Sequence, residues 1–315
     1  MEEIRKVKER YKDYLLKLPN VVGVGVSNQH IVVMVEKLTP EIREMLPKTL
    51  DGIPVEIIEV GRIRLFDYDT TKRWRPAPGG VSIGHPEVTA GTLGCAVYKN
   101  GEIFGLSNNH VIAVNWGYRK IGRKGDKILQ PGRYDGGKLP DDAIGELEDW
   151  VTVNISEPNK VDCAIFKPYD GMLRAEVLKI GIPAGIKEPE IGMKVFKFGR
   201  SCHYAANKII AVNATVRVWG YGVCTFEEQF VVKNPFGIPG DSGSVVFTEG
   251  NDVVGLLFAG SYSATVCNYA SNVARALNID FVIPEVPKYY MAVPLSYITS
   301  FMIGAIGGAK PVHKA

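Results

Sequence analysis

The chain has 315 residues, of which 46% are hydrophobic and 23% are charged, and its formal net charge is +3. This length leaves room for two or three domains with a sizeable core, and the composition is typical of a soluble globular protein. The net charge is too small to indicate nucleic acid as a partner, and the sequence has no basic run of useful length.

The cysteines are scattered, odd in number and without a Cys-x-x-Cys pair; they are Cys95, Cys163, Cys202, Cys224 and Cys267. This usage is typical of reduced, buried thiols, and it argues against a disulfide framework and against a zinc site. The first residues are charged and include no apolar run, so we expect no signal peptide. Together these features predict a cytoplasmic protein without a bound metal.

Residues 1–68 are expected to form a small α+β module. Apolar residues recur at helical spacing up to Pro19, which would end a first helix. The following pattern predicts a strand, a strand, a short helix and a strand, at Val21–Val26, His30–Glu36, Pro40–Leu46 and Pro54–Val60. The sequence leaves open whether such a module is a prodomain, an interaction domain or a plug.

Residues 69–86 are expected to be a linker, and residues 87–282 an all-β domain. Prolines and paired glycines between Lys72 and Gly80 cannot continue a helix, and we expect an ordered crossover here rather than a protease-sensitive segment. From residue 87 onward, short strand patterns alternate with Gly, Asp and Asn turns, and no long helix is indicated. That spacing predicts two β-barrels.

The segment Pro239–Ser244 reads Pro-Gly-Asp-Ser-Gly-Ser and precedes an apolar run. A serine between glycines suits a tight loop, because Gly240 can adopt backbone angles that a side chain would block. Such a loop can expose the Ser242 hydroxyl next to backbone N–H groups, as nucleophilic attack on a carbonyl requires. An ordinary turn before a strand is the alternative that this segment alone allows.

Two further residues favour the catalytic interpretation. His110 lies between the polar turn Ser-Asn-Asn and an apolar run, and Asp162 lies inside a segment that otherwise resembles a core strand. A buried carboxylate is costly unless it is hydrogen-bonded, and a histidine would supply the partner. A base held by a carboxylate and reaching a serine is the nucleophile–base–orienter arrangement. His203 is the rival histidine, and we expect it in a loop or in contact with substrate.

The motifs Asn-Asn-His-Val, Asp-Cys-Ala-Ile and Gly-Asp-Ser-Gly-Ser, in this order, resemble those of the trypsin-like double-β-barrel serine peptidases. The strand-like segment Val254–Ser261 is similar to the substrate-binding strand of that family. The resemblance covers about Pro78 to Ile279 and is greatest to intracellular bacterial members and to the plant narrow-leaf regulator. The chain departs from secreted trypsins in having no cysteine beside His110 and in having Ser244 where they have glycine.

The resemblance implies a serine endopeptidase acting on a polypeptide substrate without a cofactor. Ser242 would be the nucleophile, His110 the general base and Asp162 its orienting carboxylate, with Asp141 or Asp142 as the next candidates for the last role. The N–H groups of Gly240 and Ser242 would form the oxyanion hole. The alternative is a peptide-binding or scaffold protein that kept the fold and is catalytically weak or inactive.

The resemblance also implies a substrate pocket that contains Phe236, Phe258 and Gly260. Phe236, six residues before the nucleophile, would lie at the base of this pocket and Gly260 on its wall. Because no carboxylate is present there to pair with a basic side chain, the sequence predicts cleavage after apolar or small residues rather than after Lys or Arg.

Asp241 precedes the nucleophile, and a buried carboxylate at this position needs a partner. In secreted trypsins the partner is a new N-terminal amine, but Val81-Ser82-Ile83-Gly84 does not match the start of a mature trypsin. We therefore expect Asp241 to bond internally, to a backbone amide or to an arginine such as Arg200, and the intact chain to be competent.

The last segment, residues 283–315, contains an uncharged run from Tyr289 to Ala309 that is long enough to span a bilayer. Pro294 and polar residues make its hydrophobicity modest. We expect this tail to dock onto the body or onto a neighbouring subunit, so that the tail or the N-terminal module could build a homo-oligomer. Membrane association through residues 289–309 is the alternative.

Overall fold

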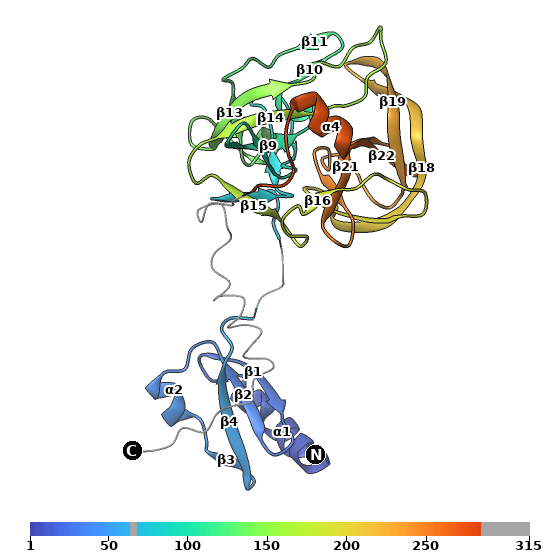
Figure 1. Ribbon diagram of the computed structural model, residues 1–315. Helices are drawn as coiled ribbons and strands as arrows, with labels where there is room; N and C mark the ends of the chain where they lie inside the picture. The colour runs from blue at the N-terminus through green and yellow to red at the C-terminus, as the bar shows by residue number, and fades with distance from the viewer. Residues whose placement is uncertain (64–67, 285–315) are drawn as a thin grey trace. The chain divides into compact units, whose positions relative to one another are not determined.

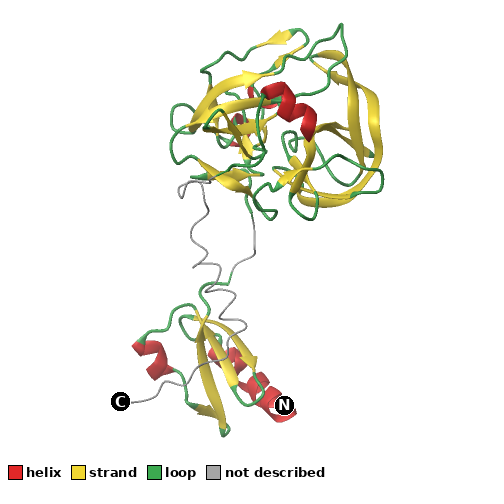
Figure 2. Ribbon diagram, in the orientation of Figure 1, coloured by secondary structure: helices red, strands yellow, loops and turns green. Residues whose placement is uncertain are grey.

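The computed structural model describes residues 1–63 and 68–284, which fall into two compact units, residues 1–68 and the chain from residue 69 onward (Figure 1). The first unit mixes helix and sheet, whereas the second is built mainly of strands (Figure 2). The architecture is therefore mainly β, with a small α+β unit at the N-terminus.

The first unit is a four-stranded sheet with the order β1-β2-β4-β3. Strands β1 and β2 are antiparallel, whereas β2 and β4 are parallel because the chain between them crosses over through α2. Its elements are α1 (Glu2–Leu15), β1 (Val21–Val26), β2 (Ile31–Val35), α2 (Pro40–Met45), β3 (Thr49–Leu50) and β4 (Ile53–Glu59).

The core of this unit follows from the alternation of side chains along β2. Ile31, Val33 and Val35 are fully buried on one face, where Val7 and Leu15 of α1 belong to the same apolar cluster. Residues two apart along a strand share a face, so one strand supplies the centre of the core. The predicted order α-β-β-α-β is present, with the short β3 added before the last strand.

The second unit begins with a barrel built around the five-stranded sheet β12-β13-β14-β9-β8. A bridge between Gly84 and Leu129 connects its β12 edge to the chain after β6, and the amide of Gly94, after β7, donates to the carbonyl of Leu106 in β9. These contacts close the sheet into a barrel. The strands are β5 (Ala77–Gly79), β6 (Ser82–Ile83), β7 (Gly91–Thr92), β8 (Ala96–Lys99), β9 (Glu102–Ser107), β10 (Asn115–Trp116), β11 (Arg119–Lys120), β12 (Lys127–Leu129), β13 (Ala143–Trp150), β14 (Ala164–Pro168) and β15 (Leu173–Val177).

The prediction that residues 69–86 form a linker is wrong. Ala77–Gly79 is strand β5, which pairs with β15, and β6 pairs with β7 inside the first barrel. Every residue from Ala77 to His85 is buried. The prolines and glycines of this segment prevent a helix, but they do not prevent its backbone from pairing and being buried. The barrel unit therefore begins near residue 69 rather than residue 87.

The second barrel is a seven-stranded sheet whose order is β16-β21-β20-β17-β18-β19-β22, and an additional pairing of β21 with β22 closes it. Large apolar side chains fill its interior, including Phe230 and Phe236. Its elements are β16 (Gly185–Ile186), β17 (Lys194–Gly199), β18 (His203–Gly220), β19 (Gly222–Lys233), β20 (Val245–Phe247), β21 (Asp252–Gly260), β22 (Ala264–Tyr269) and the helix α4 (Ala270–Leu277). The second unit thus has the trypsin-like double-β-barrel fold.

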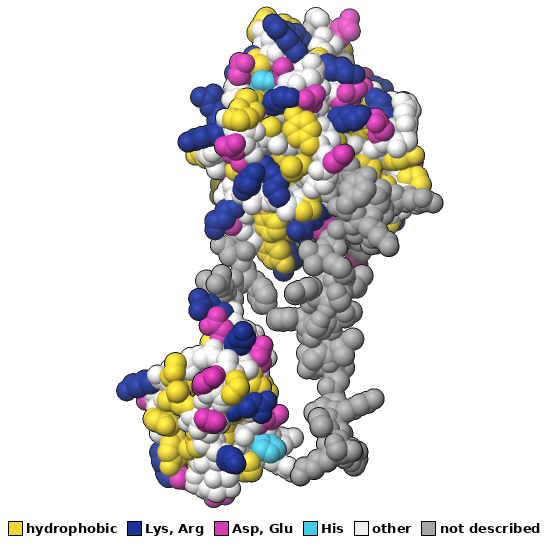
Figure 3. Space-filling model, turned by 90° about the vertical axis from the view of Figure 1, so that its left-hand side faces the viewer, with side chains coloured by type: hydrophobic (Ala, Val, Ile, Leu, Met, Phe, Trp, Pro, Cys, Tyr) yellow, Lys and Arg dark blue, Asp and Glu magenta, His cyan; other side chains and the backbone are white. Residues whose placement is uncertain are grey.

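The surface in Figure 3 carries basic and acidic side chains side by side on the second unit. On that face, its described residues form no continuous surface of one charge. No helix in residues 1–63 or 68–284 is long and apolar enough to cross a membrane. The apolar run predicted at 289–309, with its expected docking or membrane association, lies outside the described residues.

Candidate active site

His110 and Asp162 are in direct contact in the first barrel. His110 lies in the short helix α3 (Asn109–Ile112), just after β9, and Asp162 lies just before β14. The His110 Nδ1 atom hydrogen-bonds Asp162 Oδ2, and the His110 backbone N–H donates to Oδ1 at 3.1 Å. Because the carboxylate engages Nδ1, the imidazole presents Nε2 as the atom free to accept a proton.

Buried amides hold this pair in place. Asp162 is completely buried, and its own N–H donates to Asn268 Oδ1 at 3.0 Å, while its carbonyl accepts from Asn108 Nδ2 at 2.6 Å. Next to His110, the Asn109 side chain donates to the Val151 carbonyl at 2.7 Å and accepts from the Asn115 amide. The Asn-Asn before the histidine therefore fixes the loop to both neighbouring segments, a role that the sequence motif did not reveal.

Ser242 lies in the loop before β20, on the second barrel. Its Oγ donates to the Phe258 carbonyl at 3.4 Å, and within the described residues no hydrogen bond connects Oγ to His110. The two barrels nevertheless meet here, since a Cβ added to Gly91 would approach both a Val111 methyl group (2.5 Å) and the Ser242 carbonyl oxygen (2.9 Å). The structure thus joins two of the three predicted catalytic residues and leaves the serine hydroxyl turned toward Phe258.

The loop around Ser242 provides two backbone donors. Gly240 and Gly243 have φ of 97° and 96°, which a residue with a side chain adopts only under strain. In the described chain, neither the Gly240 N–H nor the Ser242 N–H donates to a protein acceptor. The Asp241 carbonyl, by contrast, accepts from the N–H and the hydroxyl of Ser244, at 3.0 and 2.6 Å.

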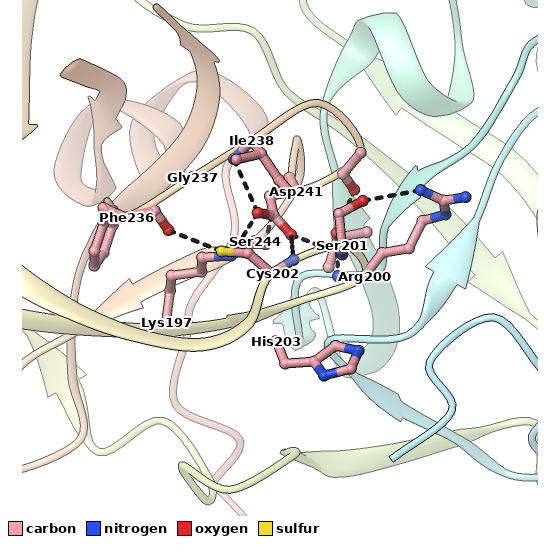
Figure 4. Close-up of polar contacts among 12 residues, drawn as sticks. Lys197, Arg200, Ser201, Cys202, His203, Phe236, Gly237, Ile238, Asp241 and Ser244 are labelled. Atoms are coloured by element: carbon pink, nitrogen blue, oxygen red, sulfur yellow. Dashed lines mark hydrogen bonds and ion pairs between the residues drawn. The ribbon is translucent and has the colours of Figure 1, made fainter. Parts of the chain in front are cut away.

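The side chain of Asp241, within this loop, is fully buried (Figure 4). Its Oδ1 accepts from the backbone amides of Ser201 and Cys202, at 2.9 and 3.1 Å, and its Oδ2 from the amide of Ile238, at 3.1 Å. The Lys197 ammonium lies 2.7 Å from Oδ2. Burial would raise the pKa of this carboxyl, but the charge of Lys197 and the donated hydrogen bonds hold that pKa below its ordinary value.

The expectation that Asp241 bonds a backbone amide agrees with these contacts, but the suggested partner Arg200 is wrong. Arg200 forms a bidentate pair with Asp135 instead, with N···O distances of 2.6 and 2.5 Å. Lys197, rather than Arg200, supplies the positive charge beside Asp241. The available signal was the alternation in β17, which turns Val195, Lys197 and Gly199 toward one side of the strand.

Arg200 and Thr92 connect the two barrels beside the loop. The Arg200 backbone N–H donates to Thr92 Oγ1 at 3.1 Å, so the single hydroxyl proton of Thr92 is left to donate to the Gly240 carbonyl at 2.9 Å. The Thr92 N–H donates to the Ser242 carbonyl at 2.7 Å. One buried threonine of the first barrel therefore holds carbonyls on both sides of Asp241.

A cavity of about 950 Å³ opens beside Ser242. Its walls are mostly apolar or small, and it is lined by Asn234, Pro235, Gly237, Ile238, Leu257, Ala259, Gly260 and Thr265, with Lys233 as a charged member. Asn234 organises one wall, because its Oδ1 accepts from Thr265 Oγ1 at 2.6 Å and from the Phe236 amide at 3.1 Å.

Of the three predicted pocket residues, only Gly260 lines this cavity. Phe236 does not form its base, since its side chain is 1% exposed and packs in the core of the second barrel. Phe258 contributes its carbonyl to Ser242 while its ring packs on Phe226, 4.6 Å between centroids. Phe258 also lines an adjoining cavity of about 740 Å³, together with His110 and Trp116.

The remaining candidates make contacts outside the His110–Asp162 pair. His203 begins β18 and stacks on Phe198, with ring centroids 5.8 Å apart. The side chain of Asp142 pairs with Arg73 at 3.2 Å. His203 and Asp142 therefore have other partners, and Asp141 is exposed.

Comparison with protein-family models gave no match, and comparison with curated proteins gave none either. Similar solved structures are a Nocardiopsis protease (18% identity, 64% of this chain and 97% of that chain, TM-score 0.48) and the alpha-lytic protease homolog N4 (15%, 65% and 99%, TM-score 0.48). A Cellulomonas bogoriensis chymotrypsin is also similar (20%, 65% and 97%, TM-score 0.45). The fold assignment itself follows from the strand pairing described above.

Proposed function

We propose that the chain is a serine endopeptidase that hydrolyses polypeptides through His110, Asp162 and Ser242. The observations that carry this proposal are an imidazole oriented by a buried carboxylate and, on the loop that presents Ser242, two N–H groups that have no acceptor among the described residues. A nucleophile, a base with its orienter and donors for an oxyanion are the parts that acyl transfer needs.

The first chemical step forms a bond between Ser242 Oγ and the carbonyl carbon of the scissile peptide. The hydroxyl must first rotate away from the Phe258 carbonyl, and its proton then passes to His110 Nε2. Catalytic hydrogen bonds are often long before substrate binds, so the present orientation of the hydroxyl is compatible with this step. The N–H groups of Gly240 and Ser242 would stabilise the negative oxygen of the tetrahedral intermediate.

The intermediate collapses when the peptide C–N bond breaks and His110 gives its proton to the leaving amine. The acyl group remains on Ser242 as an ester. Water, deprotonated by His110, then attacks this ester, and the carboxylic acid leaves with restoration of the serine hydroxyl. Asp162 stabilises the imidazolium that forms in each half-reaction.

The cavity beside Ser242 supports a preference for apolar or small side chains before the cleaved bond. Its lining includes Ile238, Leu257 and Ala259 and, among the described residues, no carboxylate that could pair with Lys or Arg. A peptide library that is cleaved mainly after Lys or Arg would contradict this preference.

A catalytically weak peptide-binding protein is the second candidate. It is favoured by one observation, the bond of the Ser242 hydroxyl to Phe258 rather than to His110. The two candidates can be distinguished by incubating wild type and Ser242→Ala with unfolded casein and with a peptide library, and by measuring cleavage and peptide binding. A serine endopeptidase loses all turnover in the variant, whereas a binding protein retains peptides in both forms and cleaves none.

A further inference from the structure

Lys197 is completely buried, and this needs an explanation. It lies in β17 between two phenylalanines, and its side chain and that of Asp241 both have no exposed surface. Its Nζ makes no hydrogen bond of regular geometry with a described residue, so the attraction to Asp241 Oδ2 at 2.7 Å is what compensates its burial. Unpaired buried charges are strongly unfavourable, so the two side chains hold each other in place.

The space around this pair is shaped for it. A Cβ added to Gly199 would lie 2.4 Å from Ser244 Oγ, 2.6 Å from Asp241 Oδ1 and 3.0 Å from Lys197 Nζ. The glycine two residues after Lys197, on the same face of β17, therefore leaves room for the carboxylate and the hydroxyl. Lys197 and Ser244 form one buried polar cluster with Asp241 (Figure 4).

This cluster determines which way the backbone of the serine loop faces. Both Ser244 donors bind the Asp241 carbonyl, at 3.0 and 2.6 Å, and so turn it toward the interior. Because a trans peptide is planar, the N–H of Ser242 in the same peptide unit must point the opposite way, toward the space beside the nucleophile. The ion pair anchors the side chain of the same Asp241, so the loop is fixed at its side chain and at its backbone.

We propose that Lys197 and Ser244 are positioning residues that hold the oxyanion donors of the uncleaved chain in their catalytic orientation. The internal ammonium of Lys197 supplies the positive charge that the buried Asp241 needs, so no new chain terminus is required. Neither residue touches substrate; both act through Asp241. This inference rests on the proposed peptidase function.

The test uses full-length wild type and Lys197→Met, with a chromogenic peptide amide as substrate and the matching peptide boronate as inhibitor. A boronate places a negatively charged oxygen where the oxyanion forms, so its affinity reports the donors directly. We expect kcat to fall about 10²-fold and the boronate affinity to fall in parallel, with KM nearly unchanged. The matched control is Lys194→Met on the same strand, whose Nζ lies 5.0 Å from the Phe196 ring centroid, and it should behave as wild type.

Two further variants keep the test decisive if Lys197→Met does not fold. Lys197→Met/Asp241→Asn contains no buried charge at this position and should fold, yet it should still lose most of its boronate affinity. Ser244→Ala keeps the ion pair and removes one bond to the Asp241 carbonyl, so we expect kcat about 10-fold lower at unchanged KM.

Each outcome separates the two proposals. Folded variants with the kcat and boronate affinity of an active wild type would show that this inference is wrong while the peptidase function stands. A folded wild-type chain that neither cleaves the substrate nor binds the boronate would contradict the proposed function, and this inference with it.

Discussion

Asp162 acts, in the proposed mechanism, only through the tautomer and orientation of His110. Asp162→Asn keeps the size of the side chain but can donate to Nδ1, which would leave Nε2 protonated and unable to accept the serine proton. We expect kcat to fall about 10⁴-fold with little change in the unfolding temperature. Asp141→Asn, on an exposed loop, is the control, and a loss in that variant instead would reassign the orienting role.

The lowered pKa of Asp241 predicts how the loop responds to acid. A carboxyl whose pKa is lower in the folded state contributes stability above its unfolded pKa of about 3.9, and this contribution disappears as pH falls through the folded value. Thermal unfolding of wild type should therefore remain steady down to about pH 4 with respect to this group, and decline below it.

The double variant Lys197→Met/Asp241→Asn isolates that contribution, because it removes both charges. Its unfolding temperature should decline less than that of wild type between pH 4 and pH 2, measured by circular dichroism. Equal declines in the two proteins would mean that Asp241 titrates alike in the folded and unfolded chain, contrary to its contacts with Lys197 and three backbone amides.

For single residues, the sequence does not show in which direction a side chain in a loop points. Phe236 lies the expected number of residues before Ser242, but spacing alone does not show that its ring turns into the barrel core. Lys197 resembles any other lysine in composition, and only its place between apolar residues of one strand indicates burial. His110 and Asp162 were identifiable because each lies in a short local motif, whereas the partner of Asp241, Lys197, lies in β17 and has no motif of its own.

Among the secondary-structure elements, β17 is adapted to the buried cluster at Gly199. Gly199→Ala would place a Cβ within 2.6 Å of Ser244 Oγ and of Asp241 Oδ1, both held by other bonds. We expect a loss of about 1–3 kcal/mol in the free energy of unfolding, measured in urea, and reduced turnover. Gly250→Ala, whose Cβ would have its nearest neighbour, Asp252 Oδ2, at 3.7 Å, should change neither; equal effects at both sites would argue against steric specificity.

The connection between β7 and the serine loop depends on Thr92. Thr92→Val preserves shape but removes the hydroxyl that joins the Arg200 N–H to the Gly240 carbonyl. Leaving these buried groups unpaired should cost about 1–3 kcal/mol and lower kcat more than it raises KM. Thr89→Val, on an exposed segment, serves as the reference, and a Thr92 variant with wild-type turnover would show that the loop does not need this bond.

Strands were predictable from sequence because alternating apolar residues and Gly, Asp or Asn turns follow from local chemistry, as in β2 and β17. The segment around Ala77–Gly79 was not, since Pro and Gly disfavour helices without showing whether the backbone is covered. Its burial follows from pairing with β15, almost a hundred residues later in the chain. Barrel closure likewise depends on pairings such as β21 with β22, which periodicity cannot identify.

For the molecule as a whole, the most direct measurement is labelling of the full-length chain with a fluorophosphonate probe, followed by intact-mass spectrometry over time. The account predicts one probe adduct on the uncleaved chain, located at Ser242, absent from Ser242→Ala and strongly slowed in His110→Ala. Absence of labelling at every pH tested would contradict the peptidase function. Labelling only after an N-terminal fragment of about 70–80 residues has been lost would contradict an oxyanion loop held by Lys197 in the intact chain.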